Sequence, residues 1–197
     1  SGAMDELQLG DPEQLDTDIG PVIDATAKQE IDAYVDAFAE RDAVLKRLAA
    51  PKTGHFVAPA LLRVGGIAEL EGELFGPVLH VLRYDDEELD QLIDDINALG
   101  YGLTLGVHSR IENTWKRVSE RARVGNCYIN RNMIGAVVGV QPFGGEGLSG
   151  TGPKAGGPDD LRRLTTERTV TINTAPVGVN AQLPTLLPVP YTPHTLP

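Results

Sequence analysis

Residues 126–157 read NCYINRNMIGAVVGVQPFGGEGLSGTGPKAGG, a glycine-dense stretch that follows the short apolar run at 127–129. Glycine lets a backbone adopt positive φ or approach a ligand closely. A long glycine-rich loop after a buried strand is more often a binding surface than a linker. A flexible connector is the alternative, but Val137, Val138 and Phe143 are residues that a solvated linker would not carry. The stretch therefore predicts a binding loop at the end of a strand.

Upstream of this loop, strand and helix patterns alternate along the chain. Strands are predicted at 77–84, 103–107 and 127–129, in the order that they precede the loop. Between them, apolar stripes predict two helices, the first capped by Asp85 and Asp86 and closed by Gly100, the second capped by Ser109 and closed near Gly125. This alternation indicates an α/β fold with a parallel sheet. Ligands of such sheets bind beyond the carboxyl ends of the strands, where the glycine-rich loop begins.

The flanking segments are predicted more simply. A one-sided helix is expected from residue 25 to 49, with 44–48 as a second helical piece that Pro51 stops. Residues 55–64 read as extended chain, and Pro59 forces an edge or irregular position there.

The end of the chain shows two further patterns. Residues 164–173 (LTTERTVTIN) alternate as a strand outside the core, which is expected to pair with another subunit. Residues 182–197 are rich in proline and are expected to form a disordered or extended tail.

Composition excludes several classes of protein. The 197 residues are 41% hydrophobic and 23% charged, as in a soluble globular protein. The net charge of -11 disfavours a surface for nucleic acid or anionic membrane, which needs clustered Lys and Arg. A single cysteine, Cys127, forms no internal disulfide, so a reducing cytoplasm is expected. No metal site is predicted, because the four histidines show no ligand spacing.

Four motifs carry a resemblance to a known superfamily, and a fifth segment, which overlaps the last of them, narrows the resemblance to a subfamily. PFGGEGLSGTGPKAGG (142–157) resembles the C-terminal signature of the aldehyde dehydrogenase superfamily. IGAVVGVQPFGG (134–145) is similar to the form in 1-pyrroline-5-carboxylate dehydrogenases, including the dehydrogenase half of the bifunctional PutA proteins. GDPEQLDTDIGPVID (10–24), GHFVAPALL (54–62, with Ala60 where threonine is usual) and ELFGPVLHV (73–81) resemble further family segments in the same order. The resemblance covers about residues 7–173.

The resemblance implies roles for five residues. Glu73 would hold the ribose hydroxyls of the nicotinamide half of NAD, and Phe75 would pack beside the nicotinamide. Phe143 would line the aldehyde pocket, and the backbone N–H groups of Gly135 and Ala136 would hold the α-carboxylate of the substrate. The alternatives are a solvated acidic loop for the glutamate, core aromatic rings for the phenylalanines, and a simple turn for the other two.

The family reaction also implies what this chain does not supply. A cysteine thiolate attacks the aldehyde, hydride passes to NAD, and a glutamate activates the water that hydrolyses the thioester. Cys127 lies in a predicted strand where the family usually has an apolar residue, and is expected to be a small buried hydrophobe. No catalytic residue is therefore expected in this chain, and the resemblance places the nucleophile, the general base and the glycine-rich NAD loop before residue 1.

Two hypotheses follow for the function of this chain. The first is a fragment of an NAD-dependent L-glutamate γ-semialdehyde dehydrogenase: residues 1–157 as part of the catalytic domain, 158–175 as an oligomerisation strand segment and 176–197 as a Pro-rich tail. Its partners would be the aldehyde, the rest of the enzyme and other subunits through 164–173, and FAD only if a proline dehydrogenase domain precedes it. The alternative is a non-catalytic aldehyde-dehydrogenase-like assembly domain of a long PutA protein. Retention of Glu73, Phe75, Gly135 and Ala136 favours the enzyme.

Overall fold

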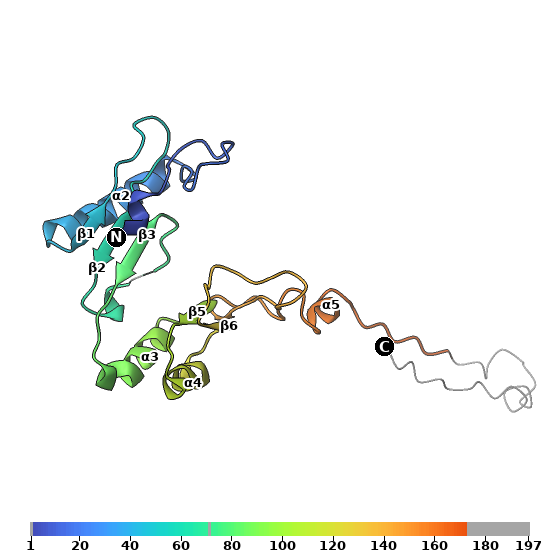
Figure 1. Ribbon diagram of the computed structural model, residues 1–197. Coiled ribbons are helices and arrows are strands. Elements are labelled where there is room, and N and C mark those ends of the chain that lie inside the picture. The colour runs from blue at the N-terminus through green and yellow to red at the C-terminus, as the bar shows by residue number, and fades with distance from the viewer. Residues whose placement is uncertain (1, 71, 173–197) are drawn as a thin grey trace, which may run out of the picture. The chain divides into compact units, whose positions relative to one another are not determined.

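The computed structural model describes residues 2–70 and 72–172 (Figure 1). The chain divides into two units, residues 1–157 and residues 158–197. Among the helices of the described residues, none combines the length and the apolar character that crossing a bilayer requires.

The first part of the chain folds into a three-stranded sheet packed against a helix (Figure 1). The elements are α1 (Gly2–Asp5), α2 (Ala25–Glu40), β1 (Val44–Arg47), β2 (Ala60–Arg63) and β3 (Val78–Val81). β1 pairs antiparallel with β2, and β2 pairs parallel with β3. The buried core between helix and sheet consists of Val35, Phe38, Ala43, Ala60, Leu62 and Val64.

The helix predicted for 25–49 is too long. α2 ends at Glu40, and the backbone reverses at Asp42, which has a φ of 54°. The prediction of helix at 44–48 is wrong, because Val44–Arg47 forms β1 and pairs with β2. Pro59 lies immediately before β2, which is the middle strand, so it holds an irregular position and no edge position.

The second part contains the alternating elements. They are η2 (Asp86–Glu88), α3 (Leu89–Ala98), β4 (Tyr101–Gly102), β5 (Thr104–Val107), α4 (Glu112–Arg121), β6 (Asn126–Ile129) and β7 (Glu146–Gly147). The short helix η1 (Ile67–Glu69) lies between β2 and β3, and α5 (Asp160–Arg163) belongs to the unit that begins at residue 158. β5 and β6 run parallel, and β4 pairs antiparallel with β7. Leu89, Ile93 and Val118 form the buried core of this part.

The predicted boundaries of the first helix here are confirmed, whereas α4 ends at Arg121, before the predicted Gly125. Asp85 forms a capping box with Glu88 ahead of α3, and Gly100 has a φ of 78° at its end. Ser109 does not cap α4 directly: its Oγ accepts from Ile111 N at 3.1 Å, and the helix begins at Glu112. The hydroxyl therefore shapes the turn that leads into the helix.

The predicted strand order needs one correction. β3 pairs with β2, and within the described residues it does not join β5 and β6 in one sheet. Alternation along the sequence predicts parallel strands with crossovers, but other strands can lie between two consecutive ones.

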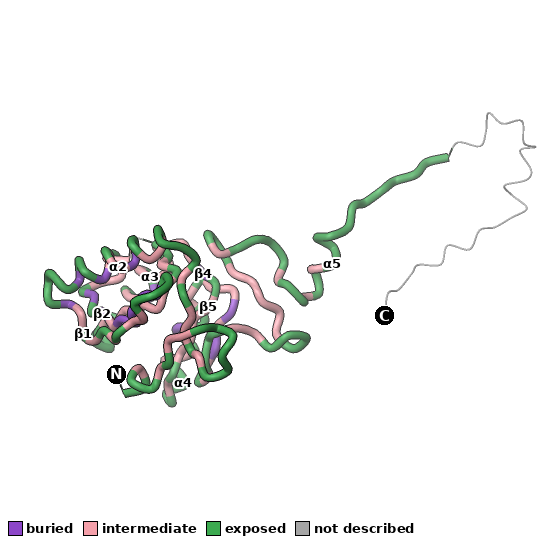
Figure 2. The backbone as a smooth tube through the Cα atoms, turned by 90° about the horizontal axis from the view of Figure 1, so that it is seen from above, coloured by how far each residue is buried: buried purple, intermediate pink, exposed green. Residues whose placement is uncertain are grey.

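The end of the described chain forms no strand. Residues 165–172 belong to no helix or strand and are exposed throughout (Figure 2). A strand forms only where a neighbouring strand pairs with its N–H and C=O groups, and the single chain offers no such neighbour to residues 165–172 as described. Pairing of 164–173 with another subunit therefore stays a prediction. Residue 173 and the tail at 176–197 lie outside the described residues.

Candidate functional site

The glycine-rich loop leaves the sheet at a fixed point. Asn130, directly after β6, has a φ of 55°. Its side chain accepts a hydrogen bond from Ser109 N at 2.9 Å and donates one to Ser109 O at 3.0 Å. These two bonds join the carboxyl ends of β5 and β6, so the loop begins where the α/β pattern predicts a ligand site.

A buried polar side chain holds the middle of the loop. Asn126, which is 8% exposed, donates through Nδ2 to Pro142 O at 3.0 Å and accepts through Oδ1 from Gly144 N at 3.3 Å. Lys154 Nζ donates to Gly125 O and lies 3.4 Å from the same Oδ1. Sequence reasoning missed these two side chains, although a polar residue inside the apolar strand NCYI was an available signal.

Phe143 lies between the two residues that Asn126 holds. Its N–H donates to Ala155 O at 3.1 Å, and Ala155 N donates to Phe143 O at 2.9 Å. The loop therefore folds back on itself as a two-stranded bridge. This half-buried phenylalanine has its backbone fixed on both sides, as the wall of a binding site requires.

Among the described residues, the N–H groups of Gly135 and Ala136 find no acceptor. Both residues are half-buried, and within the described part of the chain no hydrogen bond joins either N–H to an acceptor. A β-carbon built on Gly135 would meet no atom within 4 Å, so the space beside it is open. Two successive unpaired N–H groups next to open space can receive an anion.

Phe75 stands out from the surface on a tight turn. Its side chain is 83% exposed, which rules out a core aromatic within this chain. The turn is set by hydrogen bonds from Gly76 N to Leu74 O at 2.9 Å and from Val78 N to Gly76 O at 2.8 Å. A β-carbon on Gly76 would lie 2.7 Å from Ile31 Cδ1, so the turn packs closely against α2 and a larger residue would require the Ile31 side chain to move.

Glu73 and the glycine-rich loop meet in one hollow of about 290 Å³, to which the loop contributes Ser149. Ser149 Oγ accepts from Gly102 N at 3.1 Å, which fixes this wall. Phe75, Phe143 and the Gly135–Ala136 pair do not line this hollow. The structure thus joins Glu73 to the loop but does not gather all five predicted residues around one cavity.

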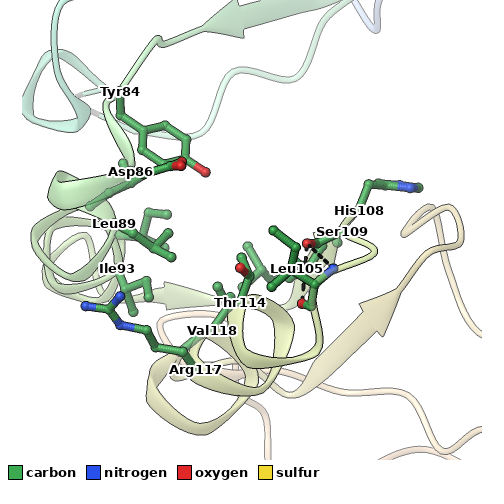
Figure 3. A pocket seen from close by; sticks show the side chains of 16 residues that line it. Tyr84, Asp86, Leu89, Ile93, Leu105, His108, Ser109, Thr114, Arg117 and Val118 are labelled. Atoms are coloured by element: carbon green, nitrogen blue, oxygen red, sulfur yellow. Dashed lines mark hydrogen bonds between the residues drawn. The ribbon is translucent and has the colours of Figure 1, made fainter.

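A larger hollow of about 510 Å³ lies between α3, β5 and α4 (Figure 3). Its wall includes core residues Leu89, Ile93 and Val118, and its rim carries Arg117. The Arg117 guanidinium, 2.5 Å from the Asp90 carboxylate, holds the pKa of that carboxyl below its usual range. This hollow contains none of the predicted site residues.

Cys127 is half-buried in β6, where it lies opposite Leu105 of β5. Burial raises the pKa of the Cys127 thiol. A raised pKa keeps the sulfur protonated at neutral pH, and the thiol is a much weaker nucleophile than the thiolate.

Comparisons with known proteins give a consistent result. The family model described as "Aldehyde dehydrogenase family" matches residues 1–170. The bifunctional protein PutA of Salmonella typhimurium is 52% identical over 206 residues, which cover 97% of this chain and 16% of that protein. A 1-pyrroline-5-carboxylate dehydrogenase of Geobacillus sp. is 37% identical over 159 residues, covering 79% of this chain and 30% of that protein.

Solved structures agree with the sequence comparisons. A crystal structure of a mutant proline utilization A from Bradyrhizobium japonicum superposes with a TM-score of 0.81 at 54% identity, covering 89% of this chain and 18% of that one. A mutant 1-pyrroline-5-carboxylate dehydrogenase of Thermus thermophilus gives a TM-score of 0.70 at 35% identity, covering 82% of this chain and 31% of that one. This chain therefore spans less than a third of the length of these relatives.

Proposed function

Because this chain belongs to the aldehyde dehydrogenase family, we propose that it is the C-terminal part of an NAD-dependent dehydrogenase that oxidises L-glutamate γ-semialdehyde to L-glutamate in proline catabolism. The family prediction from the four motifs is confirmed, as is the α/β fold class. The names of the PutA and 1-pyrroline-5-carboxylate dehydrogenase relatives support this substrate. The complete enzyme would act in the cytoplasm.

The observation that carries the proposal is the pair of unpaired N–H groups at Gly135 and Ala136. L-Glutamate γ-semialdehyde bears an α-carboxylate at the end opposite its aldehyde. Two adjacent backbone donors bind a carboxylate without a basic side chain. Phe143, fixed by Ala155 and Asn126, would line the apolar path between carboxylate and aldehyde.

Glu73 and Phe75 fit the nicotinamide half of NAD, which would accept the hydride. The carboxylate is exposed and lines a hollow, and it can accept hydrogen bonds from two ribose hydroxyls at once. The exposed ring of Phe75 is free to pack against a planar group, and the turn through Gly76 limits its movement. A purely structural domain has no need of this exposed pair.

The nucleophile and the general base would come from another part of the enzyme. The half-buried thiol of Cys127, with its raised pKa, supports this assignment. Glutamate semialdehyde should therefore cause no NAD reduction by the 197-residue chain alone. FAD would belong to a proline dehydrogenase domain, and no residue here is assigned to it.

Assembly with other subunits is proposed for the segment at 164–173. Val170 and Ile172 are 65% and 78% exposed, and residues 165–172 adopt no helix or strand in the described chain. An alternating Thr/Val sequence with exposed apolar side chains is suited to pairing with a strand of another copy.

The proposal is tested in the complete enzyme by single-turnover hydride transfer from glutamate semialdehyde to NAD. Glu73→Gln and Phe75→Ala should each slow this step roughly tenfold, because the nicotinamide is held less well. Glu87→Gln, which changes an exposed glutamate of η2, is the matched control. Unchanged transfer in both variants would refute the cofactor assignment, and a complete enzyme that does not oxidise the semialdehyde would refute the function.

A further inference from the structure

We propose that the Arg131–Gln141 pair positions the N–H groups of Gly135 and Ala136, and thereby sets the preference for aldehydes that carry a carboxylate. The inference rests on the proposed function. The N–H groups of Gly135 and Ala136 are called the anchor below. The inference assigns the preference for carboxylate-bearing aldehydes to two side chains that are not part of this anchor.

Gln141 is the acceptor for two donors from different parts of the loop. Its Oε1 accepts from Val137 N at 3.0 Å and from Arg131 Nη1 at 3.1 Å. Because both partners can only donate, the amide atom between them must be the oxygen. The side chain therefore has one defined orientation.

The backbone of Val137 is held by the same residue. Val137 O accepts from Gln141 N at 2.9 Å and from Val140 N at 3.0 Å, while Val137 N donates to the Gln141 side chain. The N–H of Val137 and the C=O of Ala136 lie in one planar peptide unit. Fixing Val137 therefore fixes the peptide that directly follows the proposed anchor.

Arg131 connects this arrangement to the sheet. Its guanidinium carbon lies 4.5 Å from the ring centroid of Tyr128, a β6 residue that is only 6% exposed. Its Nε also donates to Asn132 O at 3.1 Å. The contacts thus run from the buried ring through the guanidinium to Gln141 and then to the peptide beside the anchor.

This arrangement explains how a glycine-containing loop can present two N–H groups in a constant direction. Val137 and Val138 are 52% and 96% exposed, so apolar packing within the chain does not hold this part of the loop. Order there depends on hydrogen bonds: two backbone donors hold Val137 O, and the Gln141 side chain supplies the acceptor for Val137 N. Removing the Gln141 acceptor should leave Gly135 and Ala136 unchanged in the sequence but should let their N–H groups vary in direction.

The experiment compares three variants of the complete enzyme. Gln141→Met keeps the length of the side chain but removes the acceptor, and Gln141→Glu keeps an acceptor for both donors. Arg131→Met leaves the Val137 bond but removes its support from the sheet. The first measurement is hydrogen exchange of the Val137 amide, resolved by fragmentation of a peptide that spans residues 134–141.

We expect the Val137 amide to exchange at least roughly tenfold faster in Gln141→Met, less so in Arg131→Met, and at the parent rate in Gln141→Glu. For Gln141→Met we also expect a rise in KM for glutamate semialdehyde of roughly tenfold, with kcat nearly retained and little change for propanal. Glu adds a negative charge near a bound carboxylate, so that variant is judged by exchange alone.

Different outcomes would overturn different claims. Unchanged exchange in Gln141→Met would show that the pair does not order the loop. Faster exchange without a change in KM for the semialdehyde, while Ala136→Pro still raises that KM, would refute the positioning role alone. If Ala136→Pro also left the KM for the semialdehyde unchanged, the carboxylate anchor of the proposed function would be refuted, and the positioning role with it. If Gln141→Met impaired the oxidation of semialdehyde and propanal equally, the active site as a whole would be damaged, and the claim that the pair sets the preference for a carboxylate would fail.

Discussion

A β-carbon built on Gly125 would lie 1.8 Å from the carbonyl oxygen of Gly144, so the chain entering β6 touches the glycine-rich loop main chain to main chain. No side chain fits at that contact. The contact places Gly144, the third residue of the loop's PFGG segment, against the chain that enters β6, and with it the neighbouring backbone of Phe143.

The first prediction concerns this contact. Gly125→Ala should lower the free energy of unfolding by about 1–3 kcal/mol, because the methyl group forces the two backbones apart. Gly66→Ala is the control, since Gly66 has an extended backbone and its β-carbon would meet nothing within 4 Å. Its effect should be within about 0.5 kcal/mol. Urea unfolding of the purified chain measures both, and equal effects would contradict the contact.

Asn126 gives a second prediction. Asn126→Leu should cost about 1–3 kcal/mol of stability, because Pro142 O and Gly144 N lose their partner in a buried setting. The control is Asn132→Leu, at an exposed position of the same loop. In the complete enzyme, Asn126→Leu should also open the bridge between Phe143 and Ala155, seen as faster exchange of their amides. Protection equal to that of the parent would show that the bridge stands without Asn126.

The sequence was sufficient for features that depend on neighbouring residues. Asp85, four residues before the first turn of α3, and Gly100 after it both act as predicted, because caps are set by local backbone geometry. The helix predicted at 44–48 failed because pairing with β2 outweighs the propensity of a short segment. The parallel pairing of β5 with β6 followed from the alternation, but the pairing of β3 with β2 did not, since it is set by contacts between more distant residues.

In the candidate site, too, some residues could be predicted from the sequence and others could not. The resemblance supplied Glu73, Phe75, Gly135, Ala136 and Phe143, and the exposure of the first two matches a role in binding. It did not supply the side chains of Asn126, Gln141 or Lys154. Their partners lie 4 to 29 positions away in the sequence, so even where a polar residue in an apolar strand marks Asn126 as unusual, its partners cannot be read from the sequence.

His80 on β3 gives a prediction for pH. Its Nε2 lies 2.9 Å from Tyr34 Oη, and burial lowers the pKa of this imidazole. A lowered pKa means that folding favours the neutral ring, so its contribution to stability is full above the ordinary value near 6.5 and is lost as pH falls through the lowered value. The free energy of unfolding should therefore decline from about pH 7 to about pH 5.

His80→Gln, which retains a hydrogen-bonding side chain, should make that decline shallower. His108→Gln, at an exposed position, controls for removal of a histidine elsewhere. Urea unfolding at the two pH values gives the comparison. If the parent and His80→Gln lost stability in parallel, the decline would have to come from other groups.

The last prediction concerns the choice of substrate. Replacing Ala136 with proline removes one of the two N–H donors and restricts the backbone of Gly135 as well. Hydrogen bonds to charged groups contribute about 1.5–3 kcal/mol each, so kcat/KM of the complete enzyme for glutamate semialdehyde should fall roughly ten- to a hundredfold. Propanal, which has no carboxylate, should be affected much less.

Hydrogen exchange or circular dichroism first establishes that the variant is folded. Val138→Ala, two residues further on at a 96% exposed side chain, is the matched control and should leave both substrates unchanged. An equal loss on both substrates in Ala136→Pro would mean that the loop as a whole is damaged and that its N–H groups do not select for the carboxylate.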